Sequence, residues 1–246
     1  MTKPKCVVCG KEITGRYWLD EWGNCSCFEH GYRSCFACHR TIGRYSTLSP
    51  KTGQIGFKVD EERNVCALCQ ETCVNTRKAL DSSVEFVIKL LGRAGFKIVK
   101  EGIKSITVVT QEEMKKMSPK AEGLCRLWIN SNDPKQSTAE IFVLNGMPKI
   151  KLESVLAHEM LHFWLGYNGV DGGEQEEGFC NIGGALVLSY YVSRSGSSLA
   201  AHLNKDANTN TDYYYGVKFI EQKTKLQKLG WEKYINDILT TKKIKP

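Results

Sequence analysis

Two histidines and a glutamate in the stretch VLAHEMLHFW (155–164) have the spacing of a catalytic zinc site. His158 and His162 are four residues apart, so on a helix both lie on one face and can bind a single metal ion. Glu159 lies beside them, where its carboxylate can take a proton from a water that attacks a carbonyl polarised by zinc. The chain has only five histidines. Their placement around this glutamate favours metal chemistry over two unrelated structural histidines.

A catalytic zinc site needs a third protein ligand, which must come from outside this helix. The next predicted helix begins in GGEQEEGFC (172–180) with three glutamates, Glu174, Glu176 and Glu177. Acidic residues at a helix N-terminus often only compensate the helix dipole. Here they follow the His-Glu-x-x-His helix directly, which favours a ligand among them. The spacing does not choose among the three.

Most of the eleven cysteines fall before residue 74, and they form pairs with two-residue spacers. Such a spacer lets two ligands in one tight turn converge on a tetrahedral ion, and a second pair completes the site. Pairing in sequence order predicts a Cys₃His site and a Cys₄ site, for which zinc is the natural metal. The ligands of the first site are Cys6, Cys9, Cys27 and His30, and those of the second are Cys35, Cys38, Cys66 and Cys69.

Three residues near these pairs are alternatives or neighbours of the ligands. Cys25 could take the place of Cys27, but Cys27 preserves the two-residue spacer. His39 directly follows the third pair, and Cys73, one helical turn after the last pair, is expected to be a buried thiol. Both zinc ions are expected to be structural, because four protein ligands leave no position for a substrate.

The change in cysteine content divides the chain into a zinc-finger module, 1–73, and a second domain, 74–246. Apolar residues at helical spacing predict a helix at about 73–95 that connects them. Short apolar runs predict strands at 96–99, 105–110, 124–129 and 140–144, with a short helix near 111–117. Further helices are predicted at about 152–166, 174–193, 212–229 and 231–240. The polar stretches 193–198 and 204–211 are predicted to be loops. The expected fold class is α+β, with a small mixed sheet followed by helices.

Composition and charge narrow the function classes. The chain is 41% hydrophobic and 25% charged, which is typical of a globular protein. No run approaches the ~20 apolar residues that cross a bilayer, and MTKPKCVVCG lacks the apolar core of a secretory signal. A cytoplasmic location without membrane binding is therefore expected. Seven zinc-bound thiolates and two Zn²⁺ would lower the formal charge of +7 to about +4. No basic stripe is interleaved with aromatic residues, so nucleic-acid binding is not expected.

The motifs together resemble a known family. HEMLHFW (158–164) followed by EEGFC (176–180) is similar to the gluzincin metallopeptidases, and the paired cysteines resemble those of LIM-type fingers. With GLC (123–125) and YGVKF (215–219) in the same order, the chain resembles the plant organ-size-regulating peptidases of the DA-one family. These join LIM-type fingers to a gluzincin-like domain. The resemblance extends over nearly the whole chain and depends on the shared order of the motifs.

The resemblance assigns roles that spacing alone leaves open. It implies that Glu177, the glutamate before the glycine, is the third zinc ligand, with Glu176 where related aminopeptidases have an asparagine. It also implies that Tyr215 stabilises the oxyanion of the transition state, a task that needs a donor in addition to zinc. The alternative donors are His202, Tyr213 and Tyr214.

The predicted function is hydrolysis of peptide bonds in protein or peptide substrates by a gluzincin-like zinc peptidase, expected to be an endopeptidase. It would hold one catalytic and two structural zinc ions. Extended peptides bind readily by adding to a sheet edge, and EIFVL (140–144) is the predicted edge strand. The resemblance further implies a link to ubiquitin or another regulatory protein. The alternative function is a zinc-finger adaptor that binds proteins and whose peptidase domain is inactive or autoinhibited.

Overall fold

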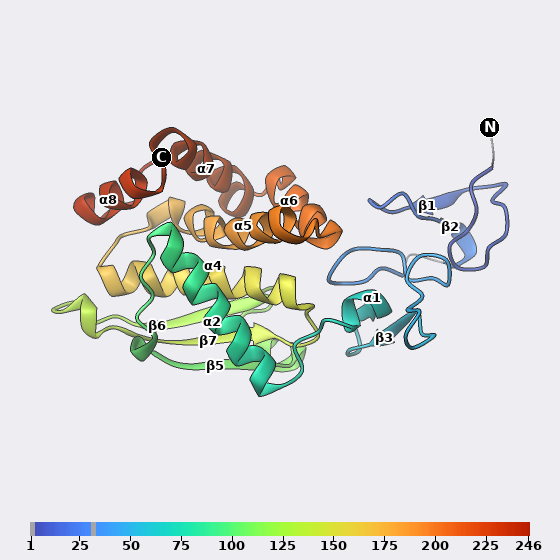
Figure 1. The fold of residues 1–246 in the computed structure, drawn as a ribbon, viewed down its shortest axis with the longest axis horizontal. Helices are drawn as coiled ribbons and strands as arrows, with labels where there is room; N and C mark the ends of the chain where they lie inside the picture. The colour runs from blue at the N-terminus through green and yellow to red at the C-terminus, as the bar shows by residue number, and fades with distance from the viewer. Residues whose placement is uncertain (1–2, 31–32) are drawn as a thin grey trace. The chain divides into compact units, whose positions relative to one another are not determined.

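The computed structural model describes residues 3–30 and 33–246. The chain forms two compact units (Figure 1). The smaller unit comprises the residues up to Asn75 together with Gly146–Lys149, and the larger unit comprises Thr76–Asn145 and Ile150–Pro246. Helices and small sheets both occur, which confirms the mixed α and β content predicted from the sequence.

The smaller unit is built from two short antiparallel hairpins. In the first, β1 (Tyr17–Leu19) pairs with β2 (Cys25–Cys27), which continues into the 3₁₀ helix η1 (Phe28–His30). In the second, β3 (Gly56–Lys58) pairs with β4 (Asn64–Cys66), which continues into α1 (Ala67–Gln70). Each strand has three residues, too few for a periodic pattern to predict it.

A buried carboxylate, Asp20, connects the two halves of this unit. Its two oxygens accept hydrogen bonds from the backbone N–H groups of Trp22, Asn24 and Thr41, at 2.9, 2.8 and 2.6 Å. Burial alone would raise the pKa of Asp20, but these bonds outweigh it and hold the pKa below its ordinary value. No spacing in the sequence marked this residue.

The larger unit contains a three-stranded mixed sheet in the order β5-β7-β6. The strands are β5 (Ile103–Val109), β6 (Gly123–Trp128) and β7 (Thr138–Leu144). The central strand β7 is parallel to β5 and antiparallel to β6. The prediction that 140–144 is an edge strand was therefore wrong, because β7 forms hydrogen bonds on both sides.

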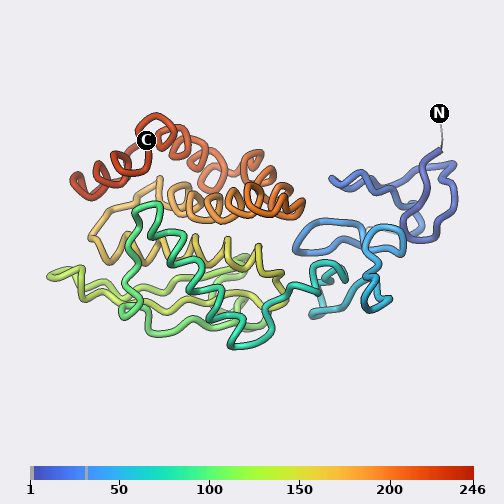
Figure 2. Tube along the Cα trace, in the orientation of Figure 1, coloured from blue at the N-terminus to red at the C-terminus, as the bar shows by residue number. Residues whose placement is uncertain are grey.

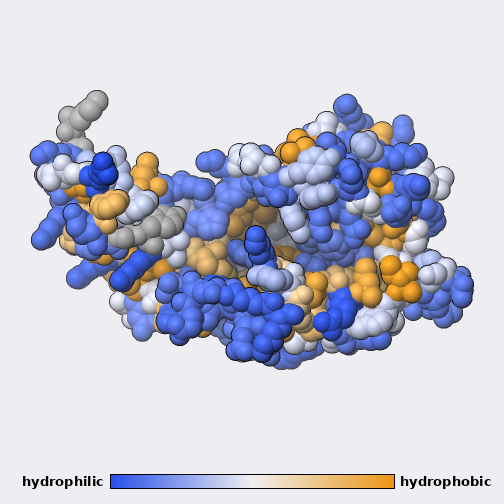
Figure 3. All heavy atoms as spheres, turned by 180° about the vertical axis from the view of Figure 1, so that it is seen from behind, coloured by the Kyte–Doolittle hydropathy of each residue, from blue (hydrophilic) through white to orange (hydrophobic). Residues whose placement is uncertain are grey.

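Helices cover the sheet in layers (Figures 1 and 2). The long helix α4 lies between the sheet and α5, and α7 lies beyond α5. None of the described helices has the length and apolar character needed to cross a membrane. Hydrophilic residues cover most of the face of the larger unit seen in Figure 3, and hydrophobic atoms show in a hollow near its middle. The helices are α2 (Arg77–Ala94), α3 (Gln111–Met117), α4 (Lys149–Asn168), α5 (Glu176–Ser195), α6 (Ser198–Thr209), α7 (Lys218–Leu229) and α8 (Trp231–Thr241), with a π-helical turn, η5 (Tyr213–Val217), before α7.

Most predicted elements of the larger unit are confirmed within a few residues, and two predictions were wrong. Residues 96–99 do not form a strand. Phe96 is instead fully buried, and its ring lies 5.2 Å from the ring of Trp164 and 5.8 Å from that of Phe179. The predicted loop at 204–211 is helical as far as Thr209. Few side chains of helix α6 are buried, so its sequence is polar, and its second half was predicted to form a loop.

Candidate metal centres and active site

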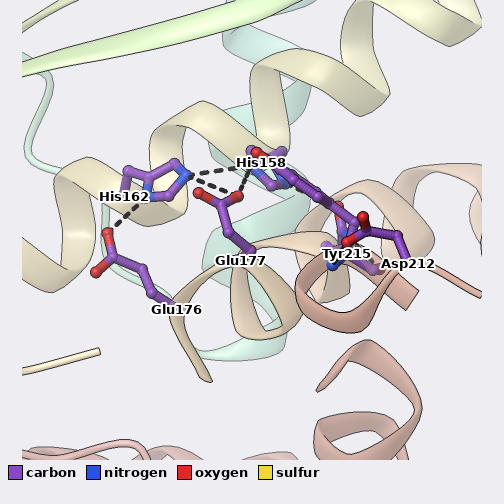
Figure 4. A network of polar contacts seen from close by, with 7 residues as sticks. His158, His162, Glu176, Glu177, Asp212 and Tyr215 are labelled. Carbon is purple, nitrogen blue, oxygen red and sulfur yellow. Dashed lines mark hydrogen bonds and ion pairs between the residues drawn. The ribbon is translucent and has the colours of Figure 1, made fainter. Parts of the chain in front are cut away.

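Helix α4 fixes the position of the His-Glu-x-x-His motif. Apolar side chains on opposite sides of the helix are fully buried, among them Leu161 and Phe163. This packing leaves little freedom to rotate the helix about its axis. His158 and His162 therefore point from one face toward α5 (Figure 4).

Helix α5 can approach α4 closely because it carries a glycine at the crossing. A Cβ atom added at Gly183 would lie only 2.7 Å from the carbonyl oxygen of Ala157, the residue before His158. The bare backbone at this point lets the first turn of α5 bring Glu177 up to the two histidines.

Three potential ligand atoms converge between the helices (Figure 4). His158 Nε2 lies 3.1 Å from His162 Nε2 and 3.2 Å from Glu177 Oε2, and His162 Nε2 lies 3.7 Å from the same oxygen. Ligands about 2.0–2.1 Å from a tetrahedral ion are separated from one another by about 3.3 Å. The three separations match that geometry.

The hydrogen bonds of the two rings show which nitrogens are free to bind an ion. Asn181 Nδ2 donates to the carbonyl oxygen of Tyr215 at 2.7 Å, so its Oδ1 must face His158 Nδ1, 2.9 Å away, and accept that proton. His162 Nδ1 donates in the same way to Glu176 Oε1 at 2.8 Å. Both Nε2 atoms then carry lone pairs toward the shared centre, as in metal-binding histidines.

The electrostatics of the centre also fit a cation. Two lone pairs and a carboxylate oxygen face one another, and buried Glu177 Oε2 accepts no hydrogen bond from any residue in the described ranges. A cation bound to all three atoms would be coordinated by the two lone pairs and would balance the charge of the carboxylate. The cluster could therefore hold a metal ion.

Glu159 lies beside the three ligand atoms and against the edge strand β6. Its side chain is nearly buried, and burial raises its pKa above the usual value, although the two histidines oppose this. The backbone of Cys125 hydrogen-bonds to its carboxylate. A Cβ atom added at Gly123 would lie 2.5 Å from Glu159 Oε1. The glycine therefore lets β6 pass next to this carboxylate.

Of the candidate oxyanion donors, the structure places Tyr215 next to the cluster of His158, His162 and Glu177. Its ring lies 6.3 Å from the His158 ring at an interplanar angle of 23°. Burial, followed by the charge of Glu177, raises the pKa of Tyr215 to about 12. The hydroxyl of Tyr213 instead donates to Glu174 at 3.4 Å.

The remaining candidates, Tyr214 and His202, make other contacts. The Tyr214 ring packs edge-on against that of Tyr213, 5.0 Å away. His202 lies on α6, with its Nε2 3.3 Å from Asp206 Oδ2.

A cavity of about 270 Å³ adjoins the candidate metal site at His158. This volume accommodates part of a substrate rather than a large cofactor. The cavity is lined by Lys120, Ala121, Glu122, Gly123, Ser154, Val155, His158, Glu159, Asn181, Gly184 and Tyr215.

The first cysteine cluster contains Cys6, Cys9, Cys27 and His30, whose ligand atoms all lie within 4.8 Å of one another. Cys6 Sγ is 3.4 Å from His30 Nδ1 and accepts hydrogen bonds from the backbone of Val8 and Cys27. Burial alone would raise the pKa of Cys6, but the backbone hydrogen bonds outweigh it and lower the pKa to about 6. A thiolate is the form that binds metal.

The second cluster contains Cys35, Cys38, Cys66 and Cys69, all buried. Cys38 Sγ and Cys66 Sγ are 3.8 Å apart, the separation expected for sulfur ligands about 2.3 Å from a tetrahedral zinc. Both clusters could hold metal ions, and their donor sets suit zinc.

The residues considered as alternatives lie outside these two clusters. Cys25 forms a backbone bridge with Cys6, whereas Cys27 supplies its sulfur to the first cluster. Cys73 donates its thiol to the carbonyl oxygen of Gly146 at 3.1 Å. His39 has a left-handed backbone, with φ of 59°.

Asn181, which contacts both His158 and the backbone of Tyr215, was not predicted from the sequence. Its position four residues after Glu177 places it on the same face of α5, and that spacing was the available signal. The role of Glu176 was also missed, because the sequence presents it only as a rival of Glu177.

These features together define a class of protein: a candidate metalloprotein with two cysteine-rich clusters and a His-His-Glu centre formed by two packed helices. A sequence model of the family described as DA1-like, Protein DA1, matches residues 102–229, more than half of the chain. The chain belongs to this family, which confirms the resemblance found in the sequence.

Two relatives from Arabidopsis thaliana show the extent of the similarity. Protein DA1-related 2 is 27% identical over 237 residues, covering 77% of this chain and 42% of the relative. Protein DA1-related 1 is 46% identical over 95 residues, covering 33% of this chain and 17% of the relative. The chain thus spans less than half the length of the curated relatives it matches. No solved structure matches the chain significantly.

Proposed function

We propose that the protein is a zinc-dependent, gluzincin-like peptidase that hydrolyses peptide bonds in protein substrates. The observation that carries the proposal is the convergence of His158 Nε2, His162 Nε2 and Glu177 Oε2, with Glu159 beside them. Three protein ligands leave a fourth position open, as in catalytic rather than structural zinc sites. DA1-like family membership supports the same proposal.

Zinc held by these three residues would polarise the scissile carbonyl and lower the pKa of the attacking water. Glu159 accepts the water proton on its carboxylate and passes it to the nitrogen of the leaving amine. Burial raises the pKa of Glu159, which makes its carboxylate a better proton acceptor. The hydroxyl of Tyr215 donates a hydrogen bond to the oxygen that becomes negative in the transition state.

The proposed substrate path follows the outer edge of β6. Within the sheet, β6 pairs only with β7. The carbonyl oxygen of Glu122 accepts a hydrogen bond from Leu144 of β7, so in an antiparallel pair the backbone groups of residues 123, 125 and 127 point away from β7. An extended segment added there would pass Glu159, and the adjoining cavity would receive one of its side chains.

The two cysteine clusters are proposed to hold structural zinc in a LIM-like module. Their closed, four-ligand donor sets leave no position for substrate. Binding of zinc would then contribute directly to the folding of this module. A link to ubiquitin or another regulatory protein stays a prediction from the family resemblance.

The test combines zinc content with cleavage of an unfolded, fluorescently labelled protein. Wild type and Glu159→Gln are each expected to hold about three zinc ions, while His158→Ala holds about two. Cleavage by Glu159→Gln should fall by roughly 10²–10⁴-fold, because the proton acceptor is lost. Glu112→Gln, the same change at an exposed position on α3, is the control and should cleave like wild type.

Two results would contradict the proposal. Cleavage by Glu159→Gln at the wild-type rate would show that Glu159 is not the general base. Two zinc ions in both wild type and His158→Ala, without cleavage, would instead favour the adaptor function.

A further inference from the structure

We propose that Asn181 is a positioning residue that couples the metal ligand His158 to the placement of Tyr215. The inference rests on the proposed function, and it adds a link between metal binding and the order of the turn that carries the oxyanion donor. Asn181 has one hydrogen bond on each side of its amide group, at 2.9 Å to His158 Nδ1 and at 2.7 Å to the carbonyl oxygen of Tyr215.

Hydrogen bonds hold the backbone of the turn that carries Tyr215, and its three tyrosine side chains are only partly packed. The side chains of Tyr213, Tyr214 and Tyr215 are all nearly half exposed. The carboxylate of Asp212 accepts the backbone N–H groups of Tyr214 and Tyr215, both at 2.9 Å. The Tyr215 backbone is thus held at its N–H by Asp212 and at its carbonyl by Asn181.

The amide of Asn181 is suited to this position because it both accepts and donates. Its Oδ1 accepts the Nδ1 proton of His158 and leaves the opposite ring nitrogen free to bind metal. Its Nδ2 can then donate only in the opposite direction, to Tyr215. An aspartate at this position would keep the first hydrogen bond but would place a carboxylate oxygen against the Tyr215 carbonyl.

A bound metal ion that holds the His158 ring would also hold the Asn181 amide and, through it, the Tyr215 backbone. Because metal binding and ordering of the Tyr215 turn both depend on the Asn181 amide, each should favour the other. Metal binding should therefore slow hydrogen exchange of the backbone amides in 212–217, and a disordered turn should weaken metal binding slightly.

The experiment compares Asn181→Asp with Asn181→Ala and the control Asn132→Asp, which makes the same change at an exposed position. Hydrogen exchange in 212–217 is measured with and without Zn²⁺, and Zn²⁺ affinity is measured by competition with a chelator. Asn181→Asp should bind Zn²⁺ within a few-fold of wild type but lose the zinc-dependent protection of the turn. Asn181→Ala should lose the protection and bind Zn²⁺ roughly 10–100-fold more weakly.

The kinetic part of the experiment uses a double-mutant cycle with Tyr215→Phe. If Asn181 acts through Tyr215, Asn181→Asp should lower kcat/KM at least about tenfold in wild type and have little further effect in Tyr215→Phe. The inference would be overturned if the loss of kcat/KM in the double variant equalled the product of the two single losses. It would also be overturned if Asn181→Asp kept the zinc-dependent protection of the turn. If the wild type cleaves no substrate, the proposed function fails, while the exchange and Zn²⁺ measurements still decide the coupling.

Discussion

The crossing of α4 and α5 gives a quantitative prediction for Gly183→Ala. The new Cβ atom would lie 2.7 Å from the carbonyl oxygen of Ala157, whereas ordinary contact begins at 3.4 Å. The helices must therefore separate by roughly 0.7 Å, since a packed interior offers few other ways to relax. Overpacking of this kind costs about 1–3 kcal/mol.

The same separation should affect the metal centre. His158 follows Ala157 on one helix, and Glu177 lies less than two turns from Gly183 on the other. Metal–ligand distances tolerate changes of only about 0.2 Å. A shift of several tenths of an ångström should therefore weaken Zn²⁺ binding at this centre by at least about tenfold.

Gly92→Ala on α2 is the matched control, because among the described residues its added Cβ meets nothing within 4 Å beyond the backbone of its own helix. Both substitutions replace a glycine inside a helix, which alone stabilises by roughly 0.5–1 kcal/mol. Urea unfolding followed by circular dichroism at the helix band reports on the larger unit, which holds every long helix. The free energy of unfolding should rise for Gly92→Ala. For Gly183→Ala it should be about 1–3 kcal/mol lower than for Gly92→Ala. Equal stabilisation by both substitutions, with unchanged Zn²⁺ affinity, would refute the reasoning.

Two further predictions concern the smaller unit. Cys69→Ala should lower the zinc content by about one ion per chain, because it removes one of four clustered sulfur atoms. Cys73→Ala should keep that ion, since the Cys73 thiol bonds to a carbonyl group instead; equal zinc loss in both, measured by atomic emission, would contradict this assignment. Asp20→Asn should destabilise the unit by about 2–4 kcal/mol near neutral pH, because charge-assisted hydrogen bonds to backbone N–H groups are weakened. The pKa of Asp20 is lowered in the folded state, so its stabilisation is present above the ordinary carboxyl pKa and is lost as the pH falls through the folded-state value. The stability difference from wild type, measured by protease susceptibility, should therefore narrow below about pH 4, and a constant difference would count against the role of this carboxylate.

Spacing in the sequence could not distinguish the roles of the three glutamates after the His-Glu-x-x-His motif. Each could have been a ligand by spacing. In the structure the carboxylate of Glu174 accepts a hydrogen bond from the hydroxyl of Tyr213, that of Glu176 from His162 Nδ1, and that of Glu177 meets both Nε2 atoms. Their roles depend on the rotation of α5 against α4, which no short stretch of sequence contains.

The order of the strands in the sheet could likewise not be predicted from local sequence patterns. Short apolar runs identified the three strands of the larger unit within two residues, because such a run is a local pattern. The order β5-β7-β6 depends on long-range hydrogen bonding, and the edge strand beside Glu159 was therefore assigned to the wrong segment.

By itself the sequence predicted the candidate ligand pairs and the His-Glu-x-x-His motif of this protein. Two-residue spacers and a four-residue helical repeat fix the distances between side chains through local backbone geometry alone. Glu177 was predicted only through the family resemblance, and Cys27 was preferred to Cys25 only for its spacer. The tertiary structure brings Glu177 to the histidines and Cys27 into its cluster, and it alone shows that Asn181 connects His158 to Tyr215. These contacts join elements far apart in the chain, so they depend on how closely the elements pack, as at Gly183, where the absence of a side chain lets two helices meet.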